Sequence, residues 1–163
     1  LLEELVRFRL GVGKWLPLDD IFVERLRSFH RFITPFICQS LILKLNEDTK
    51  FREEYVKWLK SQLFDYSEEI NENIAEQIAY LLTNKIVFHK TLETQIPELT
   101  KLRKIDAKNG AEFSDILQEQ FKEVVSKADY EGIFKPSILD EVPLPDKLVY
   151  HLNEFIEEWE RII

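Results

Sequence analysis

The sequence has no methionine, a single cysteine and only four glycines, and each of these shortages excludes something. One cysteine cannot form an internal disulfide, so we expect Cys38 to be a small apolar filler in a protein of a reducing compartment, the cytoplasm. Few glycines and long apolar patterns at helical spacing predict an all-α fold. Methionine is missing even at position 1, and the last apolar pattern reaches Ile163 without a cap or breaker. We therefore expect an excised internal piece of a longer chain.

Long hydrophobic runs are also missing. No stretch approaches the roughly 18 uncharged apolar residues that a membrane span requires, and no signal peptide opens the chain. The most apolar run, residues 32–45, is interrupted by a proline and by Lys44. With 45% hydrophobic and 32% charged residues, the composition is typical of a soluble globular protein without a membrane partner. A chain of 163 residues predicts one helical domain over residues 1–163 with a sizeable core.

Apolar residues recur at a spacing of about 3.6 along most of the chain, which predicts a multi-helix bundle. Asp19 or Asp20, Asp48 and Ser67 are the expected helix caps. Pro35 is expected to kink or end the first helix. Beyond it, an almost wholly buried segment is predicted as a continued helix or, alternatively, as a strand. The expected helices are residues 18–33, 48–64, 67–96, 111–128 and 145–163.

Three motifs with chemical meaning are incomplete. A phosphate-binding loop at Gly13-Lys14 would need glycine and Ser or Thr at the places that Phe8 and Trp15 occupy. A di-metal site in a bundle would need Glu-x-x-His pairs, and no histidine has a glutamate three residues before it. The Pro-Asp-Lys at 145–147 lacks the further acid and lysine of a nuclease motif. We assign no catalytic, cofactor-binding or metal-binding residue.

The net charge of −8 lies in residues 112–163, because acids and bases balance in residues 1–111. An acidic surface repels phosphate, so any contact with nucleic acid must come from the first two thirds of the chain. The one net-basic patch of note is residues 89–110, which is either a solvated turn or a phosphate contact. Its bases are His89, Lys90, Lys101, Arg103, Lys104 and Lys108, of which the last four are the candidate DNA-phosphate contacts.

Lys85 and His89 fall on the apolar face of the longest predicted helix. A buried lysine is costly unless it is paired. Two interpretations are open for this candidate buried polar pair. Lys85 meets a carboxylate from another helix and fixes the register of the bundle, or both side chains point into a seam where a neighbouring domain or DNA docks.

Two stretches, "EQIAYLLTNKIVFHKTLE" and "FKEVVSKADYEGIFKPSILDEVPLPDKLVYHLNEFIEEWERI", carry a resemblance. Together they resemble the helical region before the catalytic domain of adenine-specific DNA methyltransferases of restriction-modification systems, over about residues 75–163. The family's glycine-rich loop for S-adenosylmethionine and its Asn-Pro-Pro-aromatic motif are not in this sequence. The resemblance implies a parent enzyme that uses S-adenosylmethionine, flips adenine out of DNA and methylates it. It implies for this chain a non-catalytic role beside the catalytic domain.

The resemblance also interprets residues 129–146, "DYEGIFKPSILDEVPLPD". By themselves these residues fit an acidic catalytic loop, a metal loop or a hinge between helices. Within the resemblance they are an ordered, proline-rich connector that leads the last helix toward the catalytic domain. Ile133, Phe134, Ile138 and Leu139 are expected to hold it in place. The alternative function is a helical protein-interaction scaffold unrelated to DNA modification, with the acidic last third as its docking surface.

Overall fold

The computed structural model describes residues 20–128 and 131–162, and this part of the chain is helical and contains no strand. The all-α prediction is confirmed. The candidate loop at Gly13-Lys14 and a cap at Asp19 lie outside the described residues. The elements are α2 (Asp20–Glu47), α3 (Thr49–Ser61), α4 (Glu68–Glu93), α5 (Gly110–Ala128), α6 (Glu131–Phe134), the 3₁₀ helix η1 (Ile138–Glu141) and α7 (Leu148–Ile162).

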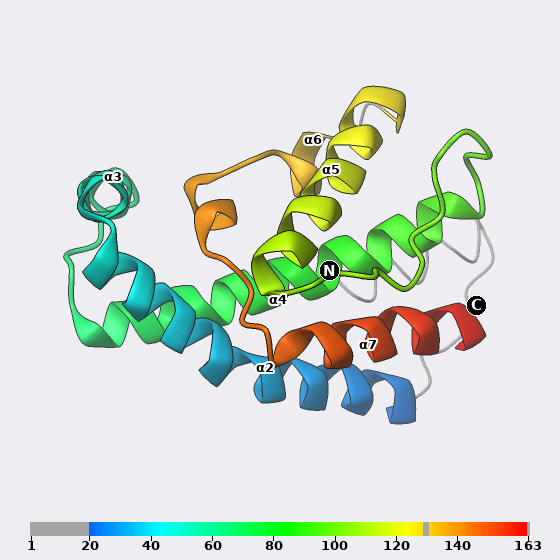
Figure 1. Ribbon diagram of the computed structural model, residues 1–163, viewed down its shortest axis with the longest axis horizontal. Helices are drawn as coiled ribbons and strands as arrows, with labels where there is room; N and C mark the ends of the chain where they lie inside the picture. The colour runs from blue at the N-terminus through cyan, green and yellow to red at the C-terminus, as the bar shows by residue number, and fades with distance from the viewer. Residues whose placement is uncertain (1–19, 129–130, 163) are drawn as a thin grey trace.

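Helix α4 is the axis of the bundle. In Figure 1, α2 and α7 lie along one side of α4, and α5 crosses the other side. Helix α3 packs at the end of the bundle where α2 turns back. Every residue of α4 from Leu82 to Leu92 is buried. The sequence predicted a single apolar face for this helix, and that expectation is wrong for its second half, because neighbouring elements cover it on all sides.

Helix α2 continues through Pro35 to Glu47, so the expectations of an ended helix or a strand are wrong. Proline removes one backbone donor but is exposed here, where water can satisfy the carbonyl that is left over. The segment after it is not wholly buried. Leu41 is fully buried, whereas Ile42 and Leu43 are 44% and 55% exposed. A helix of 3.6 residues per turn directs only every third or fourth residue inward.

Two caps begin their helices as the sequence predicted. The Asp48 carboxylate accepts a hydrogen bond from the Phe51 amide at 2.9 Å and starts α3. The Ser67 hydroxyl accepts one from the Ile70 amide at 3.0 Å and starts α4. Such caps satisfy amides at the helix start that have no partner within the helix. Leu63, two residues beyond the end of α3, is 93% exposed and has a φ of 66°.

The core has two parts. The larger part joins α2, α4, α5 and α7, where Phe29 stacks on Phe155 with ring centroids 4.4 Å apart. The smaller part joins the second half of α2 to α3, the start of α4 and η1. The largest fully buried side chains include Phe51, Tyr55, Phe113 and Phe121. Full burial of a large apolar side chain contributes about 1.5–3 kcal/mol to stability relative to its exposure.

The connector between α5 and α7 is fixed to the bundle at its described residues. Phe134 and Leu139 are buried, as predicted, and Ile138 is partly buried. The side chain of Ile133 lies outside the described residues. Ser137 and Asp140 cap η1 reciprocally, because the serine hydroxyl accepts from Leu139 and the aspartate accepts from the Ser137 amide. The Asp140 carboxylate therefore stabilises the start of η1.

The exit of the connector is held from two other helices. The Ser40 hydroxyl of α2 donates to the Pro143 carbonyl, and the Leu144 amide donates to the Ser114 hydroxyl of α5 at 3.1 Å. The Asp146 carboxylate accepts from the Gly110 amide at 2.7 Å. These contacts join the start of α5 to the start of α7.

Candidate nucleic-acid interface

The candidate basic residues lie on residues 94–109, an irregular segment that returns from the end of α4 to the start of α5 (Figure 1). Its core-facing positions are spaced by three, since Leu99, Leu102 and Ile105 are buried and the residues between them are exposed. An extended chain with a repeat of about three residues presents its side chains in this way. The segment lies against the bundle on one side and faces solvent on the other.

Asn153 of α7 holds the segment at Ile105. Its carboxamide oxygen accepts from the Ile105 amide at 2.8 Å, and its nitrogen donates to the Ile105 carbonyl at 2.9 Å. All of these atoms are in a buried environment, so both backbone groups would otherwise lack partners. The side chain makes the two hydrogen bonds that a neighbouring β-strand would make.

Lys90 and Glu93, from the last turn of α4, hold the segment at Leu102. The ammonium of Lys90 donates to the Leu102 carbonyl at 2.7 Å, and a Glu93 carboxylate oxygen accepts from the Leu102 amide. The two side chains also pair with each other at 3.2 Å and are only 2% and 8% exposed. His89 adds a contact to Glu93 at 3.4 Å.

The pKa values of this cluster reflect burial and pairing. Burial by itself would raise the pKa of Glu93, but the hydrogen bonds from His89, Leu102 and Lys90 outweigh it and leave the pKa below its ordinary value. Burial lowers the pKa of Lys90, and the pairing with Glu93 opposes that effect only in part. Within this cluster the ionised form of Glu93 is therefore stabilised, whereas the charged form of Lys90 is destabilised.

These contacts correct the predicted basic patch. Lys90 is 2% exposed and His89 is 1% exposed, so neither belongs to a surface that nucleic acid could touch. Both side chains lie inside the protein because the loop folds back over the end of α4. Sequence spacing placed both residues beside the basic turn but could not show that the turn covers them.

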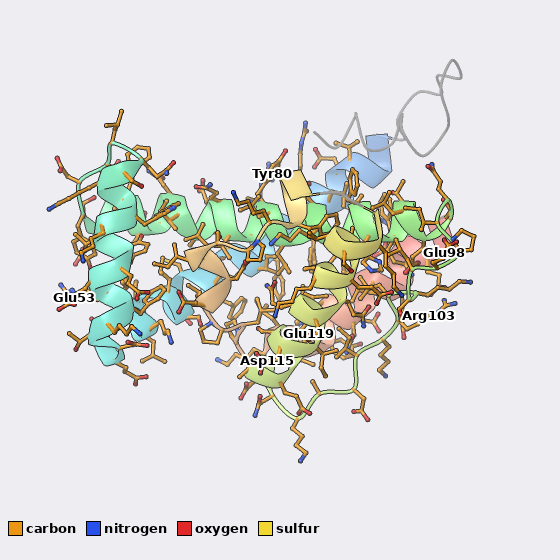
Figure 2. The ribbon with its side chains drawn as sticks, turned by 90° about the horizontal axis from the view of Figure 1, so that it is seen from above. Glu53, Tyr80, Glu98, Arg103, Asp115 and Glu119 are labelled. Carbon is orange, nitrogen blue, oxygen red and sulfur yellow. The ribbon has the colours of Figure 1, made fainter. Side chains whose placement is uncertain are left out.

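All four candidate phosphate contacts, Lys101, Arg103, Lys104 and Lys108, are exposed. Arg103 pairs with Glu160 of α7, and both side chains are about half exposed. Figure 2 labels Arg103 and Glu98 at the end of the molecule opposite α3. No ion pair within the described ranges uses the ammonium group of Lys101, Lys104 or Lys108. The segment therefore presents three free cations and one that a carboxylate partly neutralises.

Lys85 and His89, the candidate buried polar pair, are both buried but are not partners of each other. The ammonium of Lys85 lies 3.3 Å from a carboxylate oxygen of Asp140 in η1 and 5.6 Å from the ring centre of Phe121. The same Asp140 caps its own turn, so one carboxylate joins α4 to the connector. This geometry corresponds to the first interpretation of Lys85, in which a carboxylate from another element meets it.

The described ranges hold no group of three or more His, Cys, Asp or Glu side chains placed to bind a metal ion. Burial raises the pKa of the half-buried Cys38 thiol, which keeps it protonated and unreactive. The helices that the structure describes include none long and apolar enough to cross a membrane.

No protein-family model, no curated protein and no solved structure matches the chain.

Sequence reasoning missed the residues that fix the segment in place, Glu93 and Asn153. Two signals were available for Glu93, because it lies three residues after Lys90 and four after His89, the spacings that bring helical side chains together. Asn153 follows Leu152 within the apolar stripe of α7, where a polar side chain needs a buried partner. Neither signal could identify Leu102 or Ile105 as that partner.

Proposed function

We propose that the chain is a non-catalytic helical domain of an S-adenosylmethionine-dependent, adenine-specific DNA methyltransferase of the cytoplasm. In this proposal it supports the catalytic domain and touches DNA phosphates through residues 94–109. The family part rests on the sequence resemblance. The observation that supports the DNA contact is the fixed segment itself, with Lys101, Lys104 and Lys108 exposed and paired with no carboxylate of residues 20–128 or 131–162.

Rigidity is what makes such a segment suited to phosphate contact. Its backbone is held at Leu102 by α4 and at Ile105 by α7, so its lysines need not be ordered from a flexible loop when they bind. Lys108 follows Lys101 by seven positions, a span of up to about 23 Å at roughly 3.3 Å per residue of extended chain. Phosphate contacts of this kind position a protein on DNA and read no bases.

Arg103 has a smaller part in the proposal than its place among the four candidate contacts suggested. Its pairing with Glu160 must be broken before a phosphate can take the place of the carboxylate. An exposed ion pair of this kind contributes about 0–1 kcal/mol, so exchanging the carboxylate for a phosphate changes the free energy little in either direction. The three lysines are the principal contacts.

The test is the affinity of the purified chain for a DNA duplex across a series of salt concentrations. We compare the wild type with a variant in which Lys101, Lys104 and Lys108 are all alanine. If each lysine contacts one phosphate, the logarithmic salt slope falls by about 0.9 per contact, or about 2.7 in total. Because the chain has a net charge of −8, binding is measured at low salt first.

A matched variant removes the same charge from another place. Lys50, Lys57 and Lys60 lie on or beside α3, at the far end of the bundle, and all three are exposed. Changing these three to alanine should leave the salt slope nearly unchanged. Equal losses in the two variants would show that net charge alone acts, and the proposed contact would then be wrong.

A second candidate function, a protein-interaction scaffold, is favoured by a group of exposed aromatic side chains on α2 and α7. Phe32 and Tyr150 are 43% and 67% exposed, and both rings lie against His151, at 4.7 and 5.4 Å between centroids. Exposed apolar side chains gathered in this way often mark an interaction surface. Serine at positions 32 and 150 should leave DNA affinity unchanged if the two functions use separate surfaces.

A further inference from the structure

The seam between α2 and α4 opens into a cavity of about 190 Å³ whose lining residues all carry polar or charged groups, although most of the surface that they turn toward the cavity is carbon. Each helix supplies three residues at positions i, i+3 and i+4, which place them on one face. Elsewhere this seam is closed by apolar side chains such as Ile33, Ala79 and Ile86. The lining residues are Arg27, His30 and Arg31 of α2 and Tyr80, Thr83 and Asn84 of α4.

Asn84 is the unusual member of this lining. It is 1% exposed, and neither its carboxamide oxygen nor its nitrogen has a hydrogen-bond partner. Buried polar side chains are nearly always paired, so two unpartnered atoms on one carboxamide require an explanation. Thr83 beside it donates its hydroxyl to the Ala79 carbonyl at 2.8 Å and keeps its own oxygen as an acceptor.

The outer part of the lining is cationic. Arg27 and Arg31 are exposed, and no carboxylate side chain is among the lining residues. Arg27 pairs with Glu24 at 3.1 Å in an exposed contact, whereas none of the ion pairs within the described part of the chain uses Arg31. The His30 ring lies 3.0 Å from the Glu76 carbonyl and edge-on to Tyr80. Figure 2 shows Tyr80 on the side of α4 where α2 begins.

We propose that this cavity binds the phosphate group of a small phosphate ester, with Arg31 and Arg27 holding the phosphate and Asn84 hydrogen-bonding the body of the ligand. A guanidinium group matches two phosphate oxygens with two parallel N–H donors. The volume exceeds the roughly 30 Å³ share of one water but is below the 300–1,000 Å³ of drug-sized sites. The cavity therefore suits a single phosphate with a small polar body.

The source of the phosphate is either a free sugar phosphate or the 5′-terminal phosphate of a nucleic-acid strand. To reach the buried carboxamide, the ligand displaces the exposed side chain of Tyr80, while Arg31 holds the phosphate. The site is separate from residues 94–109 and does not depend on the proposed DNA contact. The two proposals can fail independently, because the cavity depends on Arg27 and Arg31 whereas the DNA contact depends on Lys101, Lys104 and Lys108.

The experiment is a calorimetric titration of the purified chain with inorganic phosphate, ribose 5-phosphate and ribose. We expect saturable binding of the two phosphates and none of ribose. Arg31→Gln should weaken ribose 5-phosphate binding by at least tenfold, whereas Arg52→Gln, on the exposed face of α3, should not change it. No saturable binding by the wild type, or equal losses in the two variants, would overturn the proposal.

A second variant examines the carboxamide. Asn84→Leu has nearly the same size and removes both polar atoms, so a merely unsatisfied side chain would leave binding intact. We expect ribose 5-phosphate to bind at least fivefold more weakly, with the helical circular dichroism unchanged. Undiminished binding would contradict the assigned role of Asn84. If the variant does not fold, Asn84→Ala provides the same comparison, because it also removes both polar atoms.

Two further titrations separate the sources of the phosphate. They use a DNA hexanucleotide with and without a 5′-phosphate. Tighter binding of the phosphorylated strand than of ribose 5-phosphate identifies a strand end as the ligand. The reverse order identifies the free sugar phosphate. Equal affinity for the two hexanucleotides, together with no binding of ribose 5-phosphate, would refute a phosphate site.

Discussion

Replacing Glu93 by glutamine should destabilise the protein strongly, although the two side chains have almost the same shape. The substitution removes one negative charge from a site where the side chain is 8% exposed. Lys90, 2% exposed, then keeps the Leu102 carbonyl and a more distant oxygen of Glu160 at 3.8 Å. It must either remain charged without its close carboxylate or give up its proton. Both outcomes cost free energy.

The magnitude follows from what each partner loses. Breaking a buried ion pair by removing one member typically costs about 3–5 kcal/mol. The glutamine oxygen can still accept from the Leu102 amide, which preserves one hydrogen bond and places the expectation near the lower bound, about 3 kcal/mol. The contact with His89 is weakened as well, because a neutral oxygen is a poorer acceptor than a carboxylate.

The assay is urea unfolding followed by circular dichroism, and the double variant with Lys90→Met is the control. Methionine fills the space of the lysine stem without a charge. Glu93→Gln with Lys90→Met should therefore recover part of the lost stability, with at least about 1 kcal/mol still missing because the buried Leu102 carbonyl has lost its donor. A loss below about 1 kcal/mol for the single change, or no recovery in the double variant, would refute the reasoning that buried charge pairing holds this segment.

Three further predictions concern Gly110, Asn153 and the acid dependence of stability. Gly110→Ala should destabilise the protein by several kcal/mol in thermal unfolding, because a Cβ there would lie 1.7 Å from the Leu144 carbonyl oxygen; a melting temperature like that of the wild type would contradict this packing. Asn153→Ala should cost about 2–4 kcal/mol in urea unfolding, since it leaves the buried amide and carbonyl of Ile105 unpaired, and faster hydrogen exchange at the Ile105 amide is the local check. Acid should weaken the fold through Glu93, because folding lowers the pKa of this carboxyl from 4.5. The contribution of Glu93 to stability is complete above pH 4.5 and is lost as the pH falls through the lower pKa of the folded state. The stability difference between the wild type and Glu93→Gln should therefore shrink in an acid titration, and a constant difference would contradict this reasoning.

The sequence by itself determined the class of the fold and most helix starts. Helical spacing of apolar residues and short polar caps act locally, over three or four residues, so Asp48 and Ser67 could be assigned without any tertiary information. The same local reasoning could not decide whether Pro35 ends the first helix, and α2 continues through it. Whether a helix ends at a proline depends on whether packing on either side outweighs one lost hydrogen bond. In α2 the buried residues on both sides hold the helix through it.

The tertiary structure decided which charges are on the surface. Lys90 and Lys101 look alike in the sequence, both within one basic stretch, yet one is buried against Leu102 and the other is exposed. The difference arises because the segment after α4 folds back over the last turn of that helix and covers whatever side chains lie there. Burial of a charge is a property of what packs against it, and for Lys90 that cover comes from a loop whose path is fixed by Asn153, about fifty positions further along the chain.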